Sequence, residues 1–177
     1  QQRASQRQGG FWLTNPLADR ELLLWRHGIA EERHPDRPDA GRALTAEGSR
    51  RTAAVAQELQ RLQLCCDPLL SSPLRRAVQT AELGVAAGLA SGFAIEASLA
   101  PGGDPRPLLQ AGNWQRLGLV GHEPDLGELA STLLGLPAGA ITLRKAGIVL
   151  IRLGPAAASL EALIGPRLLR LRHQWRL

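Results

Sequence analysis

Two histidines in this sequence stand beside residues that suit phosphoryl chemistry. His27 follows Arg26 and precedes a glycine, and His122 directly precedes Glu123. A neutral imidazole is a competent nucleophile toward phosphorus, and a guanidinium can hold phosphate oxygens in a planar fork. Each histidine by itself is weak evidence, since a charge pair at a strand end or a structural histidine would look the same.

A third segment with the same chemical bias is SSPLRRAVQTAE, residues 71–82. It indicates a strand end followed by the start of a helix, where free backbone N–H groups and the helix dipole favour a bound anion. Arg75 and Arg76 both fall in the first turn of this predicted helix. The residues alone leave open which of the two points inward.

Short apolar runs precede all three segments and predict buried strands over Glu21–Arg26, Leu69–Ser71 and Leu117–Gly121. Helices are expected between them. Their predicted ranges are Ala46–Leu62 with Thr45 as N-cap, Pro73 to about Gly88, and Pro124–Leu134. A weak strand is expected over 93–97, a hairpin over 147–153 and 159–164, and a basic helix from Pro166 onward.

Strands that alternate with helices predict an α/β fold with a mostly parallel central sheet and helices on both faces. We expect one domain over residues 21–177 and a loose N-terminal extension over residues 1–20. Ligands of parallel sheets gather at the carboxyl ends of the strands. The three polar segments each follow such an end, so we expect them to meet there.

Composition narrows the classes of partner. The net charge is +5, almost all of it from arginine, and Lys145 is the only lysine. A basic chain can bind nucleic acid, but aromatic residues make up 3% and tyrosine is absent, which argues against base stacking. An arginine-rich codon bias would explain the charge without any function. We therefore expect no nucleic-acid partner.

No apolar run approaches the length of a membrane span, and the first residues lack the apolar core of a signal peptide. Cys65 and Cys66 are adjacent, so they indicate neither a disulfide framework nor a metal site, and no pair of the four histidines has metal-ligand spacing. We expect a cytoplasmic protein with no membrane partner and no metal.

The motifs RHG, SSPLRRAVQTAE and GHEPDLGELAS, in this order, resemble the histidine phosphatase superfamily, which has the phosphoglycerate-mutase-like fold. The segments LTAEG, PGGDP, KAGIVLIRL and LIGPRLLRLR are similar to the short SixA-type phosphohistidine phosphatases. The resemblance extends from about Glu21 to about Leu171. It implies a three-layer sandwich and a phosphatase that needs no cofactor.

Carried over residue by residue, the resemblance implies that His27 is the phosphorylated nucleophile. Arg26, Arg76 and His122 would bind the phosphoryl oxygens and neutralise their charge. The arginine of the family motif is the one before alanine, which selects Arg76 over Arg75. Arginines would then supply the charge neutralisation that magnesium supplies in many other phosphoryl-transfer enzymes.

The general acid stays open among Glu123, Asp104, Glu31 and no dedicated acid at all. Glu123 follows His122, where the acid-phosphatase branch carries its aspartate donor. Asp104 lies in the region where the mutase branch places a glutamate, and Glu31 is near the nucleophile. Glu123 also stands at a predicted helix start, where a carboxylate is often only a cap.

Only residues 91–116 connect the second predicted helix to the third buried strand, which leaves little chain for a lid. An open pocket favours a phosphohistidine protein, such as a phosphorelay domain, as the substrate. The alternatives are a small-molecule phosphomonoesterase of the same fold, a mutase, and a catalytically idle phospho-binding or RNA-binding module. The short chain argues against a mutase, and the intact His27, Arg76 and His122 argue against an idle module.

Overall fold

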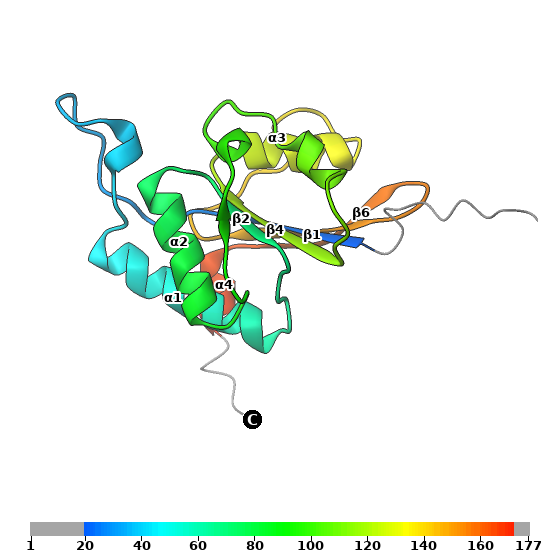
Figure 1. The fold of residues 1–177 in the computed structure, drawn as a ribbon, viewed down its shortest axis with the longest axis horizontal. Coiled ribbons are helices and arrows are strands. Elements are labelled where there is room, and N and C mark those ends of the chain that lie inside the picture. The colour runs from blue at the N-terminus through cyan, green and yellow to red at the C-terminus, as the bar shows by residue number, and fades with distance from the viewer. Residues whose placement is uncertain (1–19, 172–177) are drawn as a thin grey trace, which may run out of the picture.

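The computed structural model describes residues 20–171, which form one six-stranded sheet with helices on both faces (Figure 1). The predicted single-domain α/β architecture is confirmed. The extension predicted over residues 1–20 lies, apart from Arg20, outside the described residues. The predicted basic C-terminal helix is described as Pro166–Leu171, and the residues after it also lie outside.

The sheet has the strand order β3-β2-β4-β1-β5-β6. The strands are β1 Arg20–Arg26, β2 Leu69–Ser71, β3 Ala94–Ile95, β4 Arg116–Gly121, β5 Ile148–Leu153 and β6 Ala158–Ile164. Strands β3, β2, β4 and β1 are parallel to one another, whereas β5 is antiparallel to β1 and forms the expected antiparallel hairpin with β6. The sheet is therefore parallel where it carries the polar segments.

Within residues 20–171, four α-helices and three short 3₁₀ helices accompany the strands. They are α1 Ala46–Arg61, α2 Arg75–Ala86, α3 Asp125–Leu133, α4 Pro166–Leu171, η1 Asp39–Gly41, η2 Ala97–Leu99 and η3 Arg106–Leu109. The Thr45 side chain caps α1 by accepting a hydrogen bond from the Gly48 N–H at 2.9 Å, as the N-cap prediction requires.

The start of α2 differs from the prediction. Pro73 is not its first residue, because Leu74 still has extended backbone angles (φ −70°, ψ 134°) and serves as the N-cap. The Leu74 side chain is buried and Pro73 is exposed, so packing of Leu74 delays the helix by two residues. Arg76 nevertheless stays in the first turn, where the sequence predicted it.

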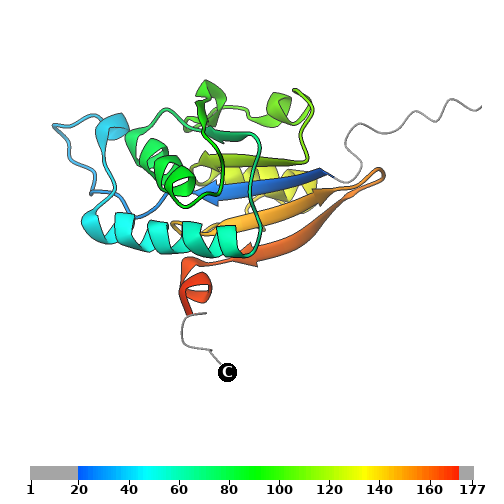
Figure 2. The ribbon, with the colours of Figure 1, turned by 60° about the horizontal axis from the view of Figure 1, so that its bottom comes forward.

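Strand β1 supplies both halves of the hydrophobic core. Its side chains alternate between the two faces of the sheet. Leu22 and Leu24 pack in the cluster that contains residues of α3, whereas Leu23 and Trp25 pack in the cluster that contains residues of α1, α2 and α4. Figure 2 shows α1 and α2 in front of the sheet and α3 behind it. All four β1 side chains are fully buried.

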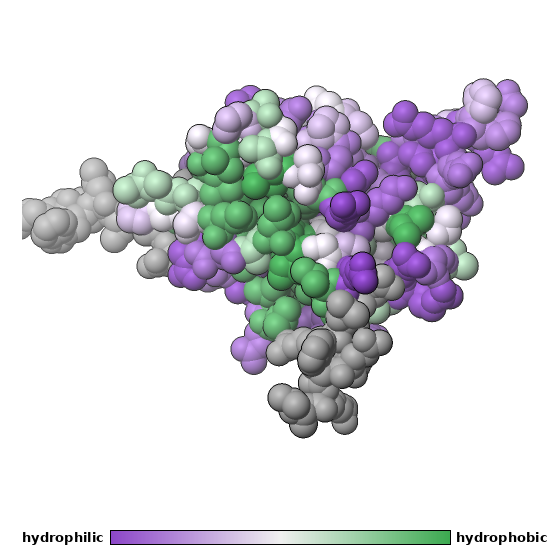
Figure 3. Space-filling view, turned by 180° about the vertical axis from the view of Figure 1, so that it is seen from behind, coloured by the Kyte–Doolittle hydropathy of each residue, from purple (hydrophilic) through white to green (hydrophobic). Residues whose placement is uncertain are grey.

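The surface is divided by polarity. Figure 3 shows the molecule from behind, with hydrophobic residues gathered in the middle of the face. Hydrophilic residues dominate the end of the molecule at the upper right of this view. The exposed large apolar side chains include Leu160 and Leu163 of β6, the edge strand. Within residues 20–171, none of the helices has the length and apolar character that crossing a bilayer requires.

Candidate active site

The three polar segments meet because their strands are neighbours. In the register of the sheet Arg26 lies beside Gly121, and Ser71 lies beside Val120. The pairing continues past the strand ends, since the His27 N–H donates to the Gly121 carbonyl at 3.1 Å. His27 and His122 therefore come together, with ring centroids 5.0 Å apart and ring planes tilted by 54°.

The two ring nitrogens of His27 have distinct partners. Arg76 Nε lies 3.2 Å from Nε2, and because an arginine nitrogen can only donate, Nε2 must be the accepting nitrogen. Nδ1 then carries the proton and donates to the Gly28 carbonyl at 2.7 Å. The contacts thus fix the tautomer in which Nε2 keeps a lone pair.

His27 is also held neutral by its surroundings. The side chain is buried, and burial lowers the pKa of His27 from 6.5 to about 3, with smaller contributions from the nearby charges of Arg76 and Arg26. The hydrogen bond to the Gly28 carbonyl acts in the opposite direction. At neutral pH the imidazole therefore has the protonation state of a nucleophile.

The structure shows which of the two adjacent arginines, Arg75 or Arg76, points inward. Arg76 is 2% exposed and directs its guanidinium toward His27. Arg75 is exposed to solvent, although it is the neighbouring residue on the same helix. Successive residues of a helix point about 100° apart, so only one of the two can face the sheet edge.

Asp39, from η1, holds the other two nitrogens of the Arg76 guanidinium. Nη1 of Arg76 donates to the Asp39 backbone carbonyl, and Nη2 donates to the Asp39 carboxylate, both at 2.9 Å. Arg42 also donates to this carboxylate, at 2.8 Å. Partial burial raises the pKa of Asp39, but the hydrogen bonds and charges of Arg76 and Arg42 together bring it below its ordinary value.

His122 faces His27 from the end of β4 and is supported by Ser72. Its Nε2 lies 2.7 Å from the Ser72 hydroxyl, which also accepts a hydrogen bond from the Leu74 N–H. Burial is the main reason that the pKa of His122 falls from 6.5 to about 4. The remaining nitrogen, Nδ1, is buried and has no hydrogen-bond partner among the described residues.

Arg26 ends β1 beside the two histidines. One of its terminal nitrogens, Nη1, donates to the Leu143 carbonyl at 2.7 Å, which anchors the side chain. Its Nε is buried without a partner in residues 20–171. Burial lowers the pKa of Arg26, and the nearby Glu123 carboxylate partly offsets that effect. Buried N–H groups without a protein partner in this part of the chain, on both Arg26 and His122, are suited to donate hydrogen bonds to an anion.

Gly28 is required by close packing. A Cβ atom at this position would lie 2.1 Å from the Thr52 hydroxyl of α1. The Gly28 N–H donates to the Thr80 hydroxyl at 3.1 Å, and that hydroxyl donates to the Arg76 carbonyl at 2.8 Å. Thr80 therefore links the backbone beside the nucleophile to the helix that carries Arg76.

Known proteins are similar to this chain in sequence and in fold. The profile of the histidine phosphatase superfamily (branch 1) matches residues 22–99. This range includes Arg26, His27 and Arg76, whereas His122 lies outside it. An uncharacterized protein of Picosynechococcus is 43% identical over 143 residues, which cover 77% of this chain and 87% of the relative. The chain belongs to the histidine phosphatase superfamily.

Solved structures of histidine phosphatases agree. A protein histidine phosphatase SixA in complex with tungstate is 25% identical, with a TM-score of 0.74 over 84% of this chain and 99% of that chain. A SixA structure from Agrobacterium tumefaciens is 21% identical, with a TM-score of 0.72 over 83% and 98%. An alpha-ribazole-5'-P phosphatase structure from Escherichia coli has 19% identity and a TM-score of 0.67 over 83% and 98%.

Glu123 is the acid candidate that this histidine phosphatase places beside the cluster. Its carboxylate accepts a hydrogen bond from the Leu143 N–H at 3.1 Å and lies near Arg26. Burial raises the pKa of Glu123, although the hydrogen bonds and the charge of Arg26 oppose the rise. A carboxyl with a raised pKa is better able to donate a proton near neutral pH.

The other two acid candidates lie elsewhere. Asp104 is exposed and ion-paired with Arg106, in a pocket whose lining includes none of the residues around His27. Glu31 is exposed, and its carboxylate accepts from the Ala43 N–H at 3.2 Å. Neither carboxylate has a contact with His27 or His122 in the described part of the chain.

Three residues that support the cluster were not assigned a role from the sequence: Asp39, Ser72 and Thr80. Asp39 lies in a charged loop without periodicity, so only its spacing to Arg42 could have drawn attention to it. This loop, within residues 31–44, contributes Asp39 to the site through its contact with Arg76, whereas the open-pocket prediction considered only residues 91–116. Across residues 20–171, no group of three or more His, Cys, Asp or Glu side chains is arranged to hold a metal ion.

Proposed function

We propose that this histidine phosphatase removes phosphate from phosphohistidine proteins through a covalent phosphohistidine on His27. One observation carries the proposal: the Arg76 contact and the Gly28 carbonyl together fix His27 as a neutral imidazole with its lone pair on Nε2. That nitrogen is the one that lies against the guanidinium of Arg76.

In the first step, Nε2 of His27 attacks the phosphorus of the substrate phosphohistidine. A new P–N bond forms to His27, the P–N bond of the substrate breaks, and the leaving imidazole takes up a proton. Charge on the three phosphoryl oxygens is balanced by Arg26, Arg76 and the Nδ1–H of His122. The contact of Ser72 with His122 Nε2 is consistent with that tautomer, since the hydroxyl can donate to Nε2.

In the second step, water attacks the phosphorus of the His27 adduct. The P–N bond breaks, inorganic phosphate leaves, and the neutral imidazole is regenerated after the water has lost a proton. Both steps pass through a loose transition state, in which positioning and electrostatics dominate. The proposed mechanism requires no metal, because Arg26 and Arg76 provide the positive charge and the neutral His122 provides an N–H donor.

Three considerations support a phosphohistidine protein as the substrate. The chain is similar to structures of SixA, one of them a protein histidine phosphatase. The segment between α2 and β4 contains only the short strand β3 and the short helices η2 and η3, which leaves little chain for a lid. The P–N bond of phosphohistidine is also intrinsically labile, so its cleavage needs little help from an acid. The alternative is a small phosphate ester, in which the leaving oxygen demands more protonation.

Trapping the intermediate tests the chemistry. Brief incubation with a ³²P-labelled phospho-substrate, followed by a quench in base, should leave label on His27 that is stable to base and lost in acid. The His27→Ala variant should take up none, and EDTA should not prevent labelling. Acid-stable label, or label that persists in His27→Ala, would show that the nucleophile is a different residue.

Side-by-side kcat/KM values test the substrate class. We expect a phosphohistidine protein to be turned over with a higher kcat/KM than sugar phosphates or nucleotides. A clear advantage for a small ester would reassign the substrate and leave the covalent mechanism intact. No phosphate release from any substrate, aryl phosphates included, would indicate a phospho-binding module without catalysis.

A further inference from the structure

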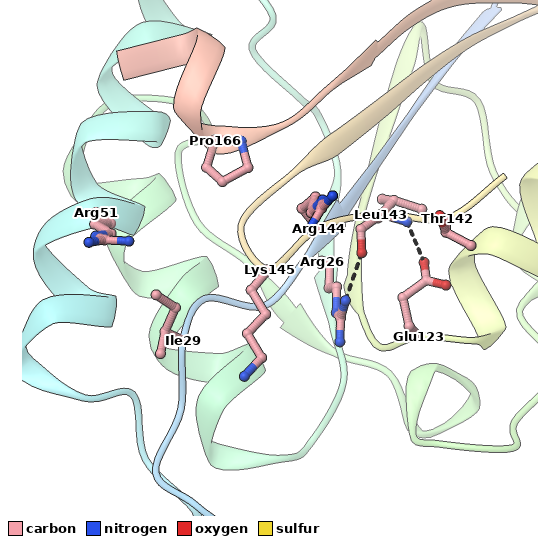
Figure 4. Close-up of a pocket in the computed structure, with 9 residues that line it drawn as sticks. All are labelled: Arg26, Ile29, Arg51, Glu123, Thr142, Leu143, Arg144, Lys145 and Pro166. Atoms are coloured by element: carbon pink, nitrogen blue, oxygen red, sulfur yellow. Dashed lines mark hydrogen bonds between the residues drawn. The ribbon is translucent and has the colours of Figure 1, made fainter. Parts of the chain in front are cut away.

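A second cationic pocket adjoins the proposed phosphoryl site. It has a volume of about 750 Å³ and is lined by Arg26, Arg51, Arg144 and Lys145, with Ile29 and Pro166 on its apolar side. Figure 4 shows that these residues come from separate parts of the chain: Arg26 from the end of β1, Ile29 from the segment after it, Arg51 from α1, Arg144 and Lys145 from the turn before β5, and Pro166 from the start of α4. Glu123 is the one carboxylate in its lining.

Most of the positive charge in this pocket is not balanced within the described residues. The Arg144 and Lys145 side chains are exposed, and neither forms an ion pair with any residue of 20–171. Arg51 is paired with Glu47, and the Glu123 carboxylate is engaged by the Leu143 N–H. The pocket therefore presents two free cations and Arg26 to whatever enters it.

The turn that carries Arg144 and Lys145 is hydrogen-bonded to the backbone of Arg26 and His27. The Ala146 N–H is shared between the carbonyls of Arg26 (3.1 Å) and His27 (3.0 Å), and the Gly147 N–H closes the turn on the Arg144 carbonyl at 2.7 Å. Trp25 Nε1 donates to the Ala146 carbonyl at 3.3 Å. The backbone that carries Arg144 and Lys145 thus has a fixed position relative to His27.

The pocket combines cationic and apolar surface. The N–H groups of Leu143, Ala146 and Gly147 already donate within the protein. The positive charge comes from the long, exposed side chains of Arg144 and Lys145, which share the pocket with the apolar residues Ile29 and Pro166. A carboxylate on an aliphatic stem, as in glutamate or aspartate, can pair with these cations and pack against the apolar residues.

We propose that this pocket binds acidic side chains that flank the phosphorylated histidine on the partner protein. The inference rests on the proposed function, because Arg26 borders both the pocket and the phosphoryl site. A substrate docked through both would present its phosphoryl group to His27 and its carboxylates to Arg144 and Lys145. The enzyme would then select phosphohistidine proteins by the charge around the modified residue.

The test uses two phosphohistidine peptides that differ only in whether the flanking residues are glutamate or glutamine. We expect the wild-type enzyme to have about fivefold higher kcat/KM for the acidic peptide at low salt, and this ratio should shrink as NaCl is added. The Arg144→Gln/Lys145→Gln variant should bring the ratio to about one. Lys145→Glu should invert the preference toward a peptide with flanking lysines.

A matched control changes the same net charge outside the pocket. The Arg106→Gln/Arg152→Gln variant also removes two exposed cations, and it should keep the wild-type ratio. Thermal unfolding of each variant, and its turnover of an aryl phosphate without a second anion, provide the reference for folding and for phosphoryl transfer. The measured quantity is the ratio of kcat/KM for the glutamate peptide to kcat/KM for the glutamine peptide, because this ratio does not depend on the amount of active enzyme.

The outcomes separate the two proposals. Equal kcat/KM for the glutamate and glutamine peptides, or a preference that survives in Arg144→Gln/Lys145→Gln, would overturn the docking role. Faster turnover of a small bisphosphate than of the acidic peptide would also overturn it, because the pocket would then serve a second phosphate. Turnover of the aryl phosphate without turnover of either peptide would contradict the proposed function, and the docking role with it.

Discussion

Asp39 and Arg76 form a two-point contact in which both terminal nitrogens of the guanidinium are bound by one residue. The Asp39 carbonyl and carboxylate each accept at 2.9 Å, while Nε of Arg76 remains directed at His27. Residues 37 positions apart are thereby joined across the site. The contact fixes the plane of the guanidinium, which determines where its N–H bonds point.

This contact predicts a positioning role for Asp39. Replacement by asparagine keeps the size but removes the charge, so we expect kcat to fall by about tenfold to a hundredfold with a smaller change in KM. Asp39→Ala should be worse, since no side-chain acceptor remains. Steady-state kinetics on an aryl phosphate would measure both.

The matched control is Asp36→Asn, an exposed carboxylate of the same loop whose ion-pair partner is His34. It should behave like the wild type. A rise in activity in Asp39→Asn would contradict the positioning role, because Asp39 would then be competing with phosphate for Arg76.

Arg76 and Arg75 provide a matched pair of adjacent residues with opposite exposure. Arg76→Ala should lower kcat by roughly two orders of magnitude or more, the loss typical of removing one preorganised donor. Arg75→Ala should have little effect, because its side chain is exposed. Similar losses in both variants would contradict the assignment of Arg76. Vanadate, which mimics the pentavalent transition state, should inhibit the wild type and bind more weakly to Arg76→Ala.

Glu123→Gln tests whether this carboxyl serves as the proton donor. If it does, the loss in kcat/KM should grow with the pKa of the leaving group, from an aryl phosphate to an alkyl phosphate, because a poor leaving group depends more on protonation. The acid limb of the pH profile should not shift, whereas the basic limb should. A loss that is the same for every leaving group would show that Glu123 only caps α3 and holds the Leu143 N–H.

Buried neutral histidines make stability depend on pH. The folded-state pKa values of His27 and His122, about 3 and about 4, lie below the ordinary value of 6.5. Below pH 6.5 the unfolded chain therefore binds protons that the folded chain does not, and the free energy of unfolding should fall as the pH falls. The slope should be about 1.4 kcal/mol per pH unit for each histidine, down to about pH 4.

Denaturant unfolding between pH 7 and pH 4 measures this slope. His122→Gln should reduce it by about half, whereas His34→Gln, which alters an exposed residue, should not change it. Asp39, whose pKa is lowered, adds to the loss only below about pH 5, so the slope due to the histidines is read above that pH. Stability that is constant over the window would contradict the neutral, buried state of both histidines.

The sequence predicted the sheet and its polar edge because the physical signals there are local. Short apolar runs mark buried strands, and Thr45 marks a helix start. The position of His27 and His122 follows from strand adjacency, which a parallel fold makes almost obligatory. The delayed start of α2 at Arg75 could not be predicted, since it depends on the packing of Leu74 against the rest of the fold.

Contacts from irregular loops were beyond the reach of sequence patterns. Asp39 contacts Arg76 from the irregular segment of residues 31–44. No periodicity in the sequence predicts the course of such a segment. The exposed cations Arg144 and Lys145 were assigned no role from the sequence, although Lys145 begins the segment KAGIVLIRL that resembles the family. Their position beside the nucleophile follows from the Ala146 hydrogen bonds to Arg26 and His27, which belong to the tertiary structure.

Successive side chains of β1 pack in alternate core clusters, and this arrangement has a consequence for folding. The residues concerned are Leu22, Leu23, Leu24 and Trp25. The strand that ends in His27 is held by both layers at once, so neither layer alone can position the nucleophile. An intermediate with only one layer packed would have the side chains of the site but not their geometry. Catalytic competence is therefore acquired in the same cooperative event that completes the core.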